Sequence, residues 1–146
     1  MRVPLTPLDF LERARRIYAP LEAAVDGDRR VTYRQFADRA HRLAHALRRD
    51  LGCRPGDRVA YLCGNTLELL EAYYGVVLAG AVLTPLNIRL SEREMQEVLD
   101  DCQPSLLVVH PSFAASDLAV RRRLDIGPEY ERLLAGQRPD LFEPDP

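Results

Sequence analysis

The sequence predicts an α/β protein with a mainly parallel sheet, helices on both faces and a short β-hairpin in front. Between residues 30 and 111, short apolar runs alternate with amphipathic segments, and brief connections separate them. The strand-like runs are continuously apolar, as strands covered on both faces require. With 47% hydrophobic residues, the 146-residue chain can form one core.

The first elements follow from capping and turn chemistry. Thr6-Pro7 predicts a helix start, because proline at the first helical position loses no hydrogen bond. Asp26-Gly27-Asp28, between two short apolar segments, predicts the hairpin. Thr32 and Gln35 match a capping box and predict a helix that ends near Gly52.

The next segments alternate between strand and helix. Asn65 with Glu68 predicts the cap of one helix, and Ser91 with Glu94 predicts the capping box of the next. Strands are predicted at residues 59–63, 81–86 and 105–110. This order predicts parallel strands joined by helical crossovers.

The pattern weakens after residue 111. We expect residues 1–111 to form an α/β subdomain and residues 112–146 to form a poorly defined tail with one short helix. Arg121-Arg122-Arg123 is interpreted as a solvated charge cluster, and Pro128 to Leu134 predicts the short helix. The polar, proline-rich residues 137–146 are typical of a linker or frayed tail.

Composition excludes several functions. The net charge of -2 gives no reason to expect nucleic acid or an anionic membrane as a partner. All 20 basic residues are arginine, so no lysine can form a Schiff base or clamp a phosphate. The three cysteines form no metal or disulfide pattern, and no apolar run could span a bilayer. We therefore expect a cytoplasmic protein.

Candidate catalytic and metal-binding residues are isolated from one another. His41 and His45 lie four apart on one predicted helix, but no third metal ligand accompanies them, so surface or partly buried histidines are expected. His110 and Cys63 lie at strand ends, which face the binding crevice of open α/β sheets. No pattern supplies a base for Cys63, and Asp100-Asp101 is interpreted as a solvated helix end.

Serines and glycines show no catalytic spacing either. The serines are interpreted as a cap, a strand start and loop residues: Ser91, Ser105, Ser112 and Ser116. None of the 8 glycines are clustered, as a phosphate-binding loop would require. Gly75 and Gly80 are attributed to tight helix packing. The sequence therefore predicts no catalytic, cofactor-binding or metal-binding residue in this chain.

The ordered motifs VTYRQFADRAHRLAHALR, GDRVA, GNTLE and AGAVLTPLNIRLSEREM resemble the N-terminal segment of AMP-forming acyl-CoA synthetases. The resemblance covers residues 4–111, and is strongest to medium- and long-chain fatty acid–CoA ligases. Related enzymes for coumarate, acetate, luciferin and peptide synthesis share this opening, so the substrate class does not follow. Gln35 stands where family members commonly carry glutamate, and serves a capping box equally well.

The resemblance implies an ATP-dependent acid–CoA ligase that uses Mg and coenzyme A and forms an acyl-adenylate. The family's phosphate loop, nucleotide-contacting residues and catalytic lysine lie downstream of this segment, and no residue here matches them. We therefore expect a truncated or fragmentary synthetase that is non-catalytic and binds no cofactor by itself. Its expected partner is the missing downstream part or a second copy of the chain.

Two alternatives remain open at this stage. The chain could be a stand-alone binding module that reuses this fold and pairs with itself or with a full-length synthetase. An unrelated nucleotide-binding α/β domain would need a glycine-rich loop after its first strand, where Asp26-Gly27-Asp28 predicts a hairpin turn instead.

Overall fold

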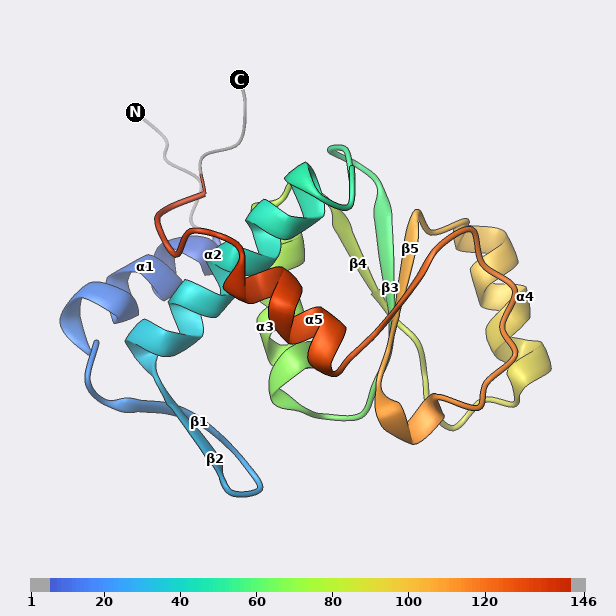
Figure 1. Ribbon diagram of the computed structural model, residues 1–146, viewed down its shortest axis with the longest axis horizontal. Helices are drawn as coiled ribbons and strands as arrows, with labels where there is room; N and C mark the ends of the chain where they lie inside the picture. The colour runs from blue at the N-terminus through green and yellow to red at the C-terminus, as the bar shows by residue number, and fades with distance from the viewer. Residues whose placement is uncertain (1–5, 143–146) are drawn as a thin grey trace.

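The computed structural model describes residues 6–142 (Figure 1). Its elements, in chain order, are α1 (Pro7–Ile17), β1 (Glu22–Asp26), β2 (Arg29–Thr32), α2 (Tyr33–Arg49), β3 (Arg58–Leu62), α3 (Leu67–Leu78), β4 (Val82–Pro85), α4 (Glu92–Cys102), β5 (Leu106–Val109), the 3-10 turn η1 (Pro111–Phe113), β6 (Arg123–Asp125) and α5 (Pro128–Ala135). The predicted order of strands and helices up to residue 111 is confirmed.

Four strands form one parallel sheet in the order β4-β3-β5-β6. β3 and β5 are central, and β4 and β6 form the two edges. The antiparallel hairpin of β1 and β2 is a separate ribbon. The predicted α/β class, the mainly parallel sheet and the preceding hairpin are confirmed.

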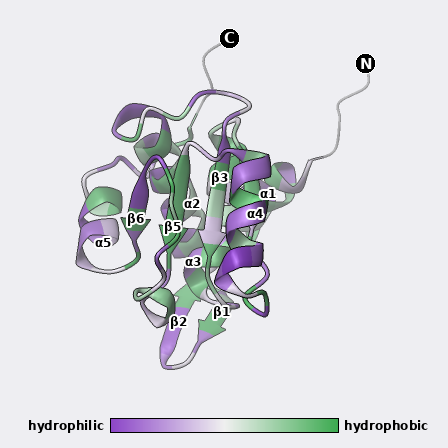
Figure 2. Ribbon diagram, turned by 90° about the vertical axis from the view of Figure 1, so that its right-hand side faces the viewer, coloured by the Kyte–Doolittle hydropathy of each residue, from purple (hydrophilic) through white to green (hydrophobic). Residues whose placement is uncertain are grey.

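Helices cover both faces of the sheet, as predicted. Helices α2, α3 and α5 lie on one face and α4 lies on the other (Figures 1 and 2). Alternation along β3 assigns its side chains: Val59 and Tyr61 pack toward the first group of helices, and Ala60 and Leu62 pack toward α4. Continuously apolar strands thus reflect burial on both sides.

Glycine permits the close approach of α2 and α3. A Cβ atom on Gly75 would lie 2.8 Å from Leu43 Cδ2 and 2.9 Å from the Ala40 carbonyl oxygen, so the packing explanation is confirmed there. Gly80 has a different role: its φ of +76° lies in the left-handed region, and a Cβ would meet Pro55 at an ordinary 3.5 Å. Attributing Gly80 to tight packing was wrong.

Helix caps form where both partners lie within one helical turn of each other in the sequence. The Thr32 hydroxyl accepts from the Gln35 amide, and the Gln35 side chain accepts from the Thr32 amide, which completes the predicted box. Ser91 and Glu94 do the same at α4. Both predicted capping boxes are confirmed.

The region after residue 111 contains more structure than its pattern indicated. The predicted short helix is present as α5, and β6 adds a fourth strand to the sheet. Arg123 begins β6 and donates to the carbonyl oxygens of Ala114 and Ser116, so its interpretation as part of a solvated charge cluster was wrong. The domain boundary at residue 111 stays a prediction. Residues 143–146 of the predicted tail lie outside the described residues.

Candidate functional site

The carboxyl ends of β3 and β5 mark the place where this topology would hold a ligand. From β3 the chain crosses to β4, and from β5 it crosses in the opposite direction to β6. A crevice forms at such a switch point in open α/β sheets. The Leu62 carbonyl accepts from the His110 amide at 2.9 Å, so the connections after the two strands start side by side.

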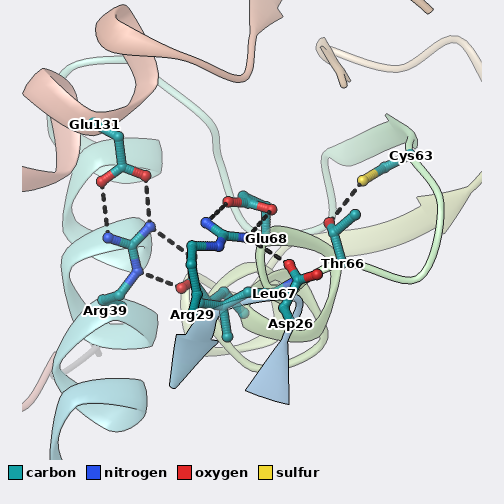
Figure 3. A network of polar contacts seen from close by, with 9 residues as sticks. Asp26, Arg29, Arg39, Cys63, Thr66, Leu67, Glu68 and Glu131 are labelled. Atoms are coloured by element: carbon teal, nitrogen blue, oxygen red, sulfur yellow. Dashed lines mark hydrogen bonds and ion pairs between the residues drawn. The ribbon is translucent and has the colours of Figure 1, made fainter. Parts of the chain in front are cut away.

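The β1–β2 hairpin lies at this edge of the sheet and contributes charged side chains that form ion pairs there. The Asp26 carboxylate accepts from the Leu67 amide at 2.9 Å, and Arg29 donates to both Asp26 and Glu68 (Figure 3). We call Asp26, Arg29 and Glu68 the hairpin cluster. The Arg29 side chain is 48% exposed, and Glu68 is buried.

The hairpin cluster also corrects the predicted start of α3. The residue before the helix is Thr66 and not Asn65, and its side chain makes no cap hydrogen bond. Asp26, from a strand 41 residues earlier, takes the first helical amide instead, and Glu68 turns toward Arg29. The predicted capping pair of Asn65 and Glu68 was therefore wrong. The distant Asp26 carboxylate binds the helix start, and the Glu68 carboxylate binds Arg29 instead.

Pairing keeps both carboxylates of the hairpin cluster ionised. The hydrogen bond from the Leu67 amide, followed by that from Arg29, lowers the pKa of Asp26. Burial raises the pKa of Glu68, but Arg29 and nearby hydrogen bonds outweigh burial and the net pKa is lowered. Neither group is left free to act as a general acid or base near neutral pH.

Cys63 lies at this edge but is not an activated nucleophile. Its sulfur lies 3.1 Å from the Thr66 hydroxyl (Figure 3). Burial raises the pKa of the thiol, which opposes formation of the reactive thiolate. His110 uses its Nδ1 atom to accept from the Ser112 amide and caps η1.

A second charge cluster joins three helices. Arg39 of α2 pairs with Glu71 of α3 and, at 2.8 Å through two nitrogens, with Glu131 of α5 (Figure 3). We call Arg39, Glu71 and Glu131 the helix cluster. Glu71 is fully buried, and burial outweighs its pairing with Arg39 and raises its pKa to about 7.

Two acidic residues in an apolar segment of the sequence indicate both clusters. Glu68 and Glu71 lie within the apolar helix segment LELLEAYYGVV, where an acidic side chain facing the core needs a paired cation. Nothing local indicated which of the 20 arginines would supply it. Arg29 and Arg39 lie 39 and 32 residues away.

The two helix histidines do not form a metal pair. His41 and His45 are buried, with 1% and 5% of their surface exposed, so the expected surface or partly buried positions were wrong. His41 contacts Glu12 and Phe142, and His45 contacts Asp140 and Phe142. Across residues 6–142, no group of three or more His, Cys, Asp or Glu side chains could hold a metal ion.

The remaining candidates have structural partners. Asp100 accepts from the Gln96 side chain on the exposed surface of α4. Ser91 caps α4, and the Ser105 hydroxyl donates to the Arg58 carbonyl oxygen before β5. None of these side chains is brought beside Cys63 or His110 by a described contact.

Side chains of residues 6–142 line a small hollow and a wider cleft on the surface. The small hollow, of about 290 Å³, lies beside the start of α3 and is lined mainly by apolar side chains, among them Val25, Leu70 and Tyr73. The wider cleft, of about 1000 Å³, lies at the opposite, amino edge of the sheet. Four exposed arginines and two aspartates line that cleft: Arg54, Arg58, Arg121, Arg122, Asp57 and Asp100. Its charge is mixed and its arginines are solvated.

Two of the helix starts in the described part of the chain use backbone amides that a phosphate would need. Phosphate groups bind where a helix start and clustered glycines present free amides. At α3 the Asp26 carboxylate already accepts the first amide, and at α4 the Ser91 hydroxyl accepts from the Glu94 amide. The glycines with positive φ are dispersed over separate turns: Gly27, Gly52, Gly56, Gly80 and Gly127. The prediction that this chain carries no cofactor or catalytic residue remains a prediction.

Known proteins share this arrangement. The family model for the AMP-binding enzyme matches residues 11–139. The 4-hydroxybutyrate–CoA ligase 2 of Metallosphaera sedula is 38% identical over 120 residues, which are 82% of this chain and 22% of that protein. The chain spans about a fifth of the length of the curated relatives it matches.

Solved structures agree with the sequence match. The anthranilate CoA ligase AuaEII superposes with a TM-score of 0.87 at 27% identity, covering 97% of this chain and 29% of that chain. The N-terminal domain of FACL13 from Mycobacterium tuberculosis gives a TM-score of 0.80 at 28% identity, covering 90% of this chain and 36% of that chain. With its sheet, its covering helices and most of its length matched, the chain belongs to the AMP-binding enzyme family, and its relatives are acyl-CoA ligases.

Proposed function

We propose that this chain forms the N-terminal α/β layer of an ATP-dependent, AMP-forming acid–CoA ligase. The carrying observation is the family match over residues 11–139, supported by superposition on the solved N-terminal domain of FACL13. In the proposed reaction, a carboxylate attacks ATP to give an acyl-adenylate and pyrophosphate. Coenzyme A then displaces AMP from the acyl group. ATP, Mg and coenzyme A are cofactors of the whole ligase in this proposal.

We propose that the chain alone does not catalyse this reaction. The sequence contains no lysine, and one amide at the start of α3 and one at the start of α4 already donate to side chains. Cys63 is held as a thiol beside Thr66. The contribution of the chain is therefore a folded support for active-site residues supplied from elsewhere.

An exposed apolar face supports the need for a partner. Leu70, Tyr73 and Val77 lie on one side of α3 and are 36%, 51% and 43% exposed, and Val82 of the edge strand β4 is 50% exposed. Apolar surface of this kind is typical of an interface. We propose that the downstream part of the ligase, or a second copy of the chain, covers it.

The same apolar face favours a second candidate, a stand-alone interaction module that pairs with itself or with a full-length synthetase. A cytoplasmic location is proposed for either candidate, and the three free cysteines support it. Within the described part of the chain, no helix is both long and apolar enough to cross a membrane. The acid activated by the ligase is not assigned, because relatives carry names of ligases for 4-hydroxybutyrate, benzoate and anthranilate.

The test is ATP–pyrophosphate exchange by the purified chain, with acetate, 4-hydroxybutyrate, benzoate and a medium-chain fatty acid as acids. We expect no exchange above the protein-free control, while a complete acyl-CoA ligase assayed beside it gives a clear signal. Exchange that depends on both acid and chain would contradict the non-catalytic proposal. The intact mass of the native protein, measured in extract of the source organism, separates the two candidates. A mass near 16.6 kDa supports the interaction module, and a mass several times larger supports the ligase layer.

A further inference from the structure

The last described residues form a strap along helix α2. Residues 136–142 follow α5 and run back toward α1 and α2 (Figure 1). We call this segment the terminal strap. Arg42 of α2 donates to the Gln137 carbonyl oxygen at 2.5 Å, and Arg15 of α1 donates to the Pro139 carbonyl oxygen at 3.2 Å. These bonds attach the strap at its near end.

His41 fixes the far end of the strap through a defined tautomer. Its Nδ1 atom lies 3.0 Å from the Phe142 amide nitrogen, so Nδ1 must accept and carry no proton. Its Nε2 atom lies 2.6 Å from a Glu12 carboxylate oxygen and therefore carries the proton. The contacts of this buried ring thus require a neutral imidazole.

His45 makes a second contact that also requires a neutral ring. Its Nε2 atom faces the Asp140 carbonyl oxygen at 3.4 Å and donates to it, and its Nδ1 atom is buried with no hydrogen-bond partner in the described part of the chain. The Phe142 ring packs edge-on against this imidazole, with the ring centroids 5.0 Å apart. A proton on Nδ1 would place a charged N–H in a site that offers it no acceptor.

We propose that His41 and His45 form a pH-sensitive switch that holds the terminal strap on α2 while both rings are neutral and releases it when they are protonated. Protonation of His41 sets its Nδ1–H against the Phe142 N–H, two donors with no acceptor between them. Protonation of His45 charges a buried ring beneath Phe142. Both events remove contacts at residues 140–142, whereas Arg15 and Arg42 keep their bonds to the nearer residues.

The charged groups around the two rings set the direction of the switch. Glu12 of α1 contacts His41, and Arg49 of α2 and Asp140 of the strap act on His45. Arg15 of α1 pairs with Glu12 and with Asp38 of α2, and Arg42 of α2 bonds to carbonyl oxygens. Burial lowers the pKa of His45 in the docked state and outweighs the hydrogen bond to the Asp140 carbonyl oxygen, which acts in the opposite direction; Arg49 adds to the lowering. Docking therefore stabilises the neutral ring, is complete above the ordinary histidine pKa of about 6.5 and is lost as the pH falls below it.

The experiment follows the backbone amides of the 146-residue chain by two-dimensional NMR between pH 7.5 and pH 5. We expect the signals of residues 140–142 to shift from docked to released positions, while those of the β3 and β5 strands stay unchanged. The docked-to-released ratio should fall by up to about tenfold per pH unit for each histidine protonated. Ring nitrogen shifts of His41 and His45, recorded in the same samples, should show the Nε2–H tautomer at pH 7.5 and the doubly protonated ring after release.

Variants test whether the two histidines cause the release of the strap. In a His41→Asn/His45→Phe double variant, Asn can still accept from the Phe142 amide and Phe keeps the aromatic contact, but neither titrates, so the strap should stay docked at pH 5. Should that variant fail to fold, His45→Phe alone keeps the aromatic contact with Phe142 but removes one titrating ring, and should make release less steep with pH. Protonated rings with an unmoved strap would overturn the proposal. So would release at unchanged pH in the double variant, or loss of strap and sheet signals together.

Discussion

The hairpin cluster and the helix cluster place the same chemistry in two different environments. In each cluster, one arginine bridges two carboxylates. Each cluster takes one glutamate from α3, and these two residues, Glu68 and Glu71, lie one turn apart. Arg29 is 48% exposed at the rim, whereas Arg39 is 24% exposed and its partner Glu71 is fully buried. The pKa of Glu68 is lowered and that of Glu71 is raised to about 7.

This difference shows that solvent access, and not the number of ion pairs, decides what a charge cluster contributes. Water competes for the rim arginine, so breaking its contacts costs less, although Glu68 itself is buried. In the interior, a carboxylate that loses its cation has no water to replace it. The helix cluster thus adds a buried ionic contact to the apolar packing of α2, α3 and α5, while the hairpin cluster mainly orients β1 and β2 at the sheet edge.

Removal of each arginine in turn should give the largest difference in stability between the two clusters. At pH 8, Arg39→Ala should lower the free energy of unfolding by about 3 to 5 kcal/mol, because it leaves Glu71 buried and unpaired. Arg29→Ala, the matched comparison, also leaves a buried carboxylate, Glu68, without its cation, but at a site where the arginine is half exposed, so it should lower this free energy by less, about 1 to 3 kcal/mol. Urea unfolding followed by far-UV circular dichroism measures both. Equal losses for the two variants would show that burial does not separate the clusters.

A change in helix packing should affect the helix cluster selectively. Gly75→Ala introduces a methyl group 2.8 Å from Leu43 and 2.9 Å from a carbonyl oxygen of α2, which forces α3 away from α2. We expect a loss of about 1 to 3 kcal/mol, typical of overpacking. In an Arg39→Ala background, Gly75→Ala should cost less stability, because the ion pair between α2 and α3 that it disturbs is already absent. Additive losses in the double-mutant cycle would argue against this coupling. Gly64→Ala, where a Cβ would meet no atom within 4 Å, is the control.

The smallest change, taken per pH unit, is a pH dependence that isolates Glu71. Because its folded pKa of about 7 exceeds the ordinary 4.5, the folded protein holds a proton between these values that the unfolded chain has released. Glu71 therefore makes stability fall as the pH rises through this window, by at most about 1.4 kcal/mol per pH unit. Glu71→Gln should remove this slope. His45 titrates in both proteins, so it cancels from the difference. Parallel stability curves for the two proteins would show that the carboxyl titrates normally.

Much of the fold could be predicted because its determinants are local. Apolar runs of four or five residues, two capping boxes and an Asp-Gly turn each lie within a few residues of sequence, and the corresponding strands, caps and hairpin are present. The covering of both sheet faces followed from the same runs. The resemblance to acyl-CoA synthetases is confirmed by the family match.

The features that were missed depend on contacts between distant residues. The α3 start is set by Asp26 and not by Asn65, and the burial of His41 depends on a strap about 100 residues later. β6 has only three residues, two of them charged, so no apolar run could reveal it; it forms because β5 offers an open edge and Leu124 reaches the core. Pattern analysis detects periodicity within an element but not the partner that completes it.

The open edges of the sheet determine how copies of this molecule could misassemble. A parallel sheet with two free edges could in principle grow into a filament, with β4 of one copy adding to β6 of the next. Pro85 interrupts β4 because it lacks an amide hydrogen, and β6 is short and begins at the end of three consecutive arginines. Both edges are therefore protected against amyloid-like extension, and any aggregation of the isolated chain should start from the apolar side of α3.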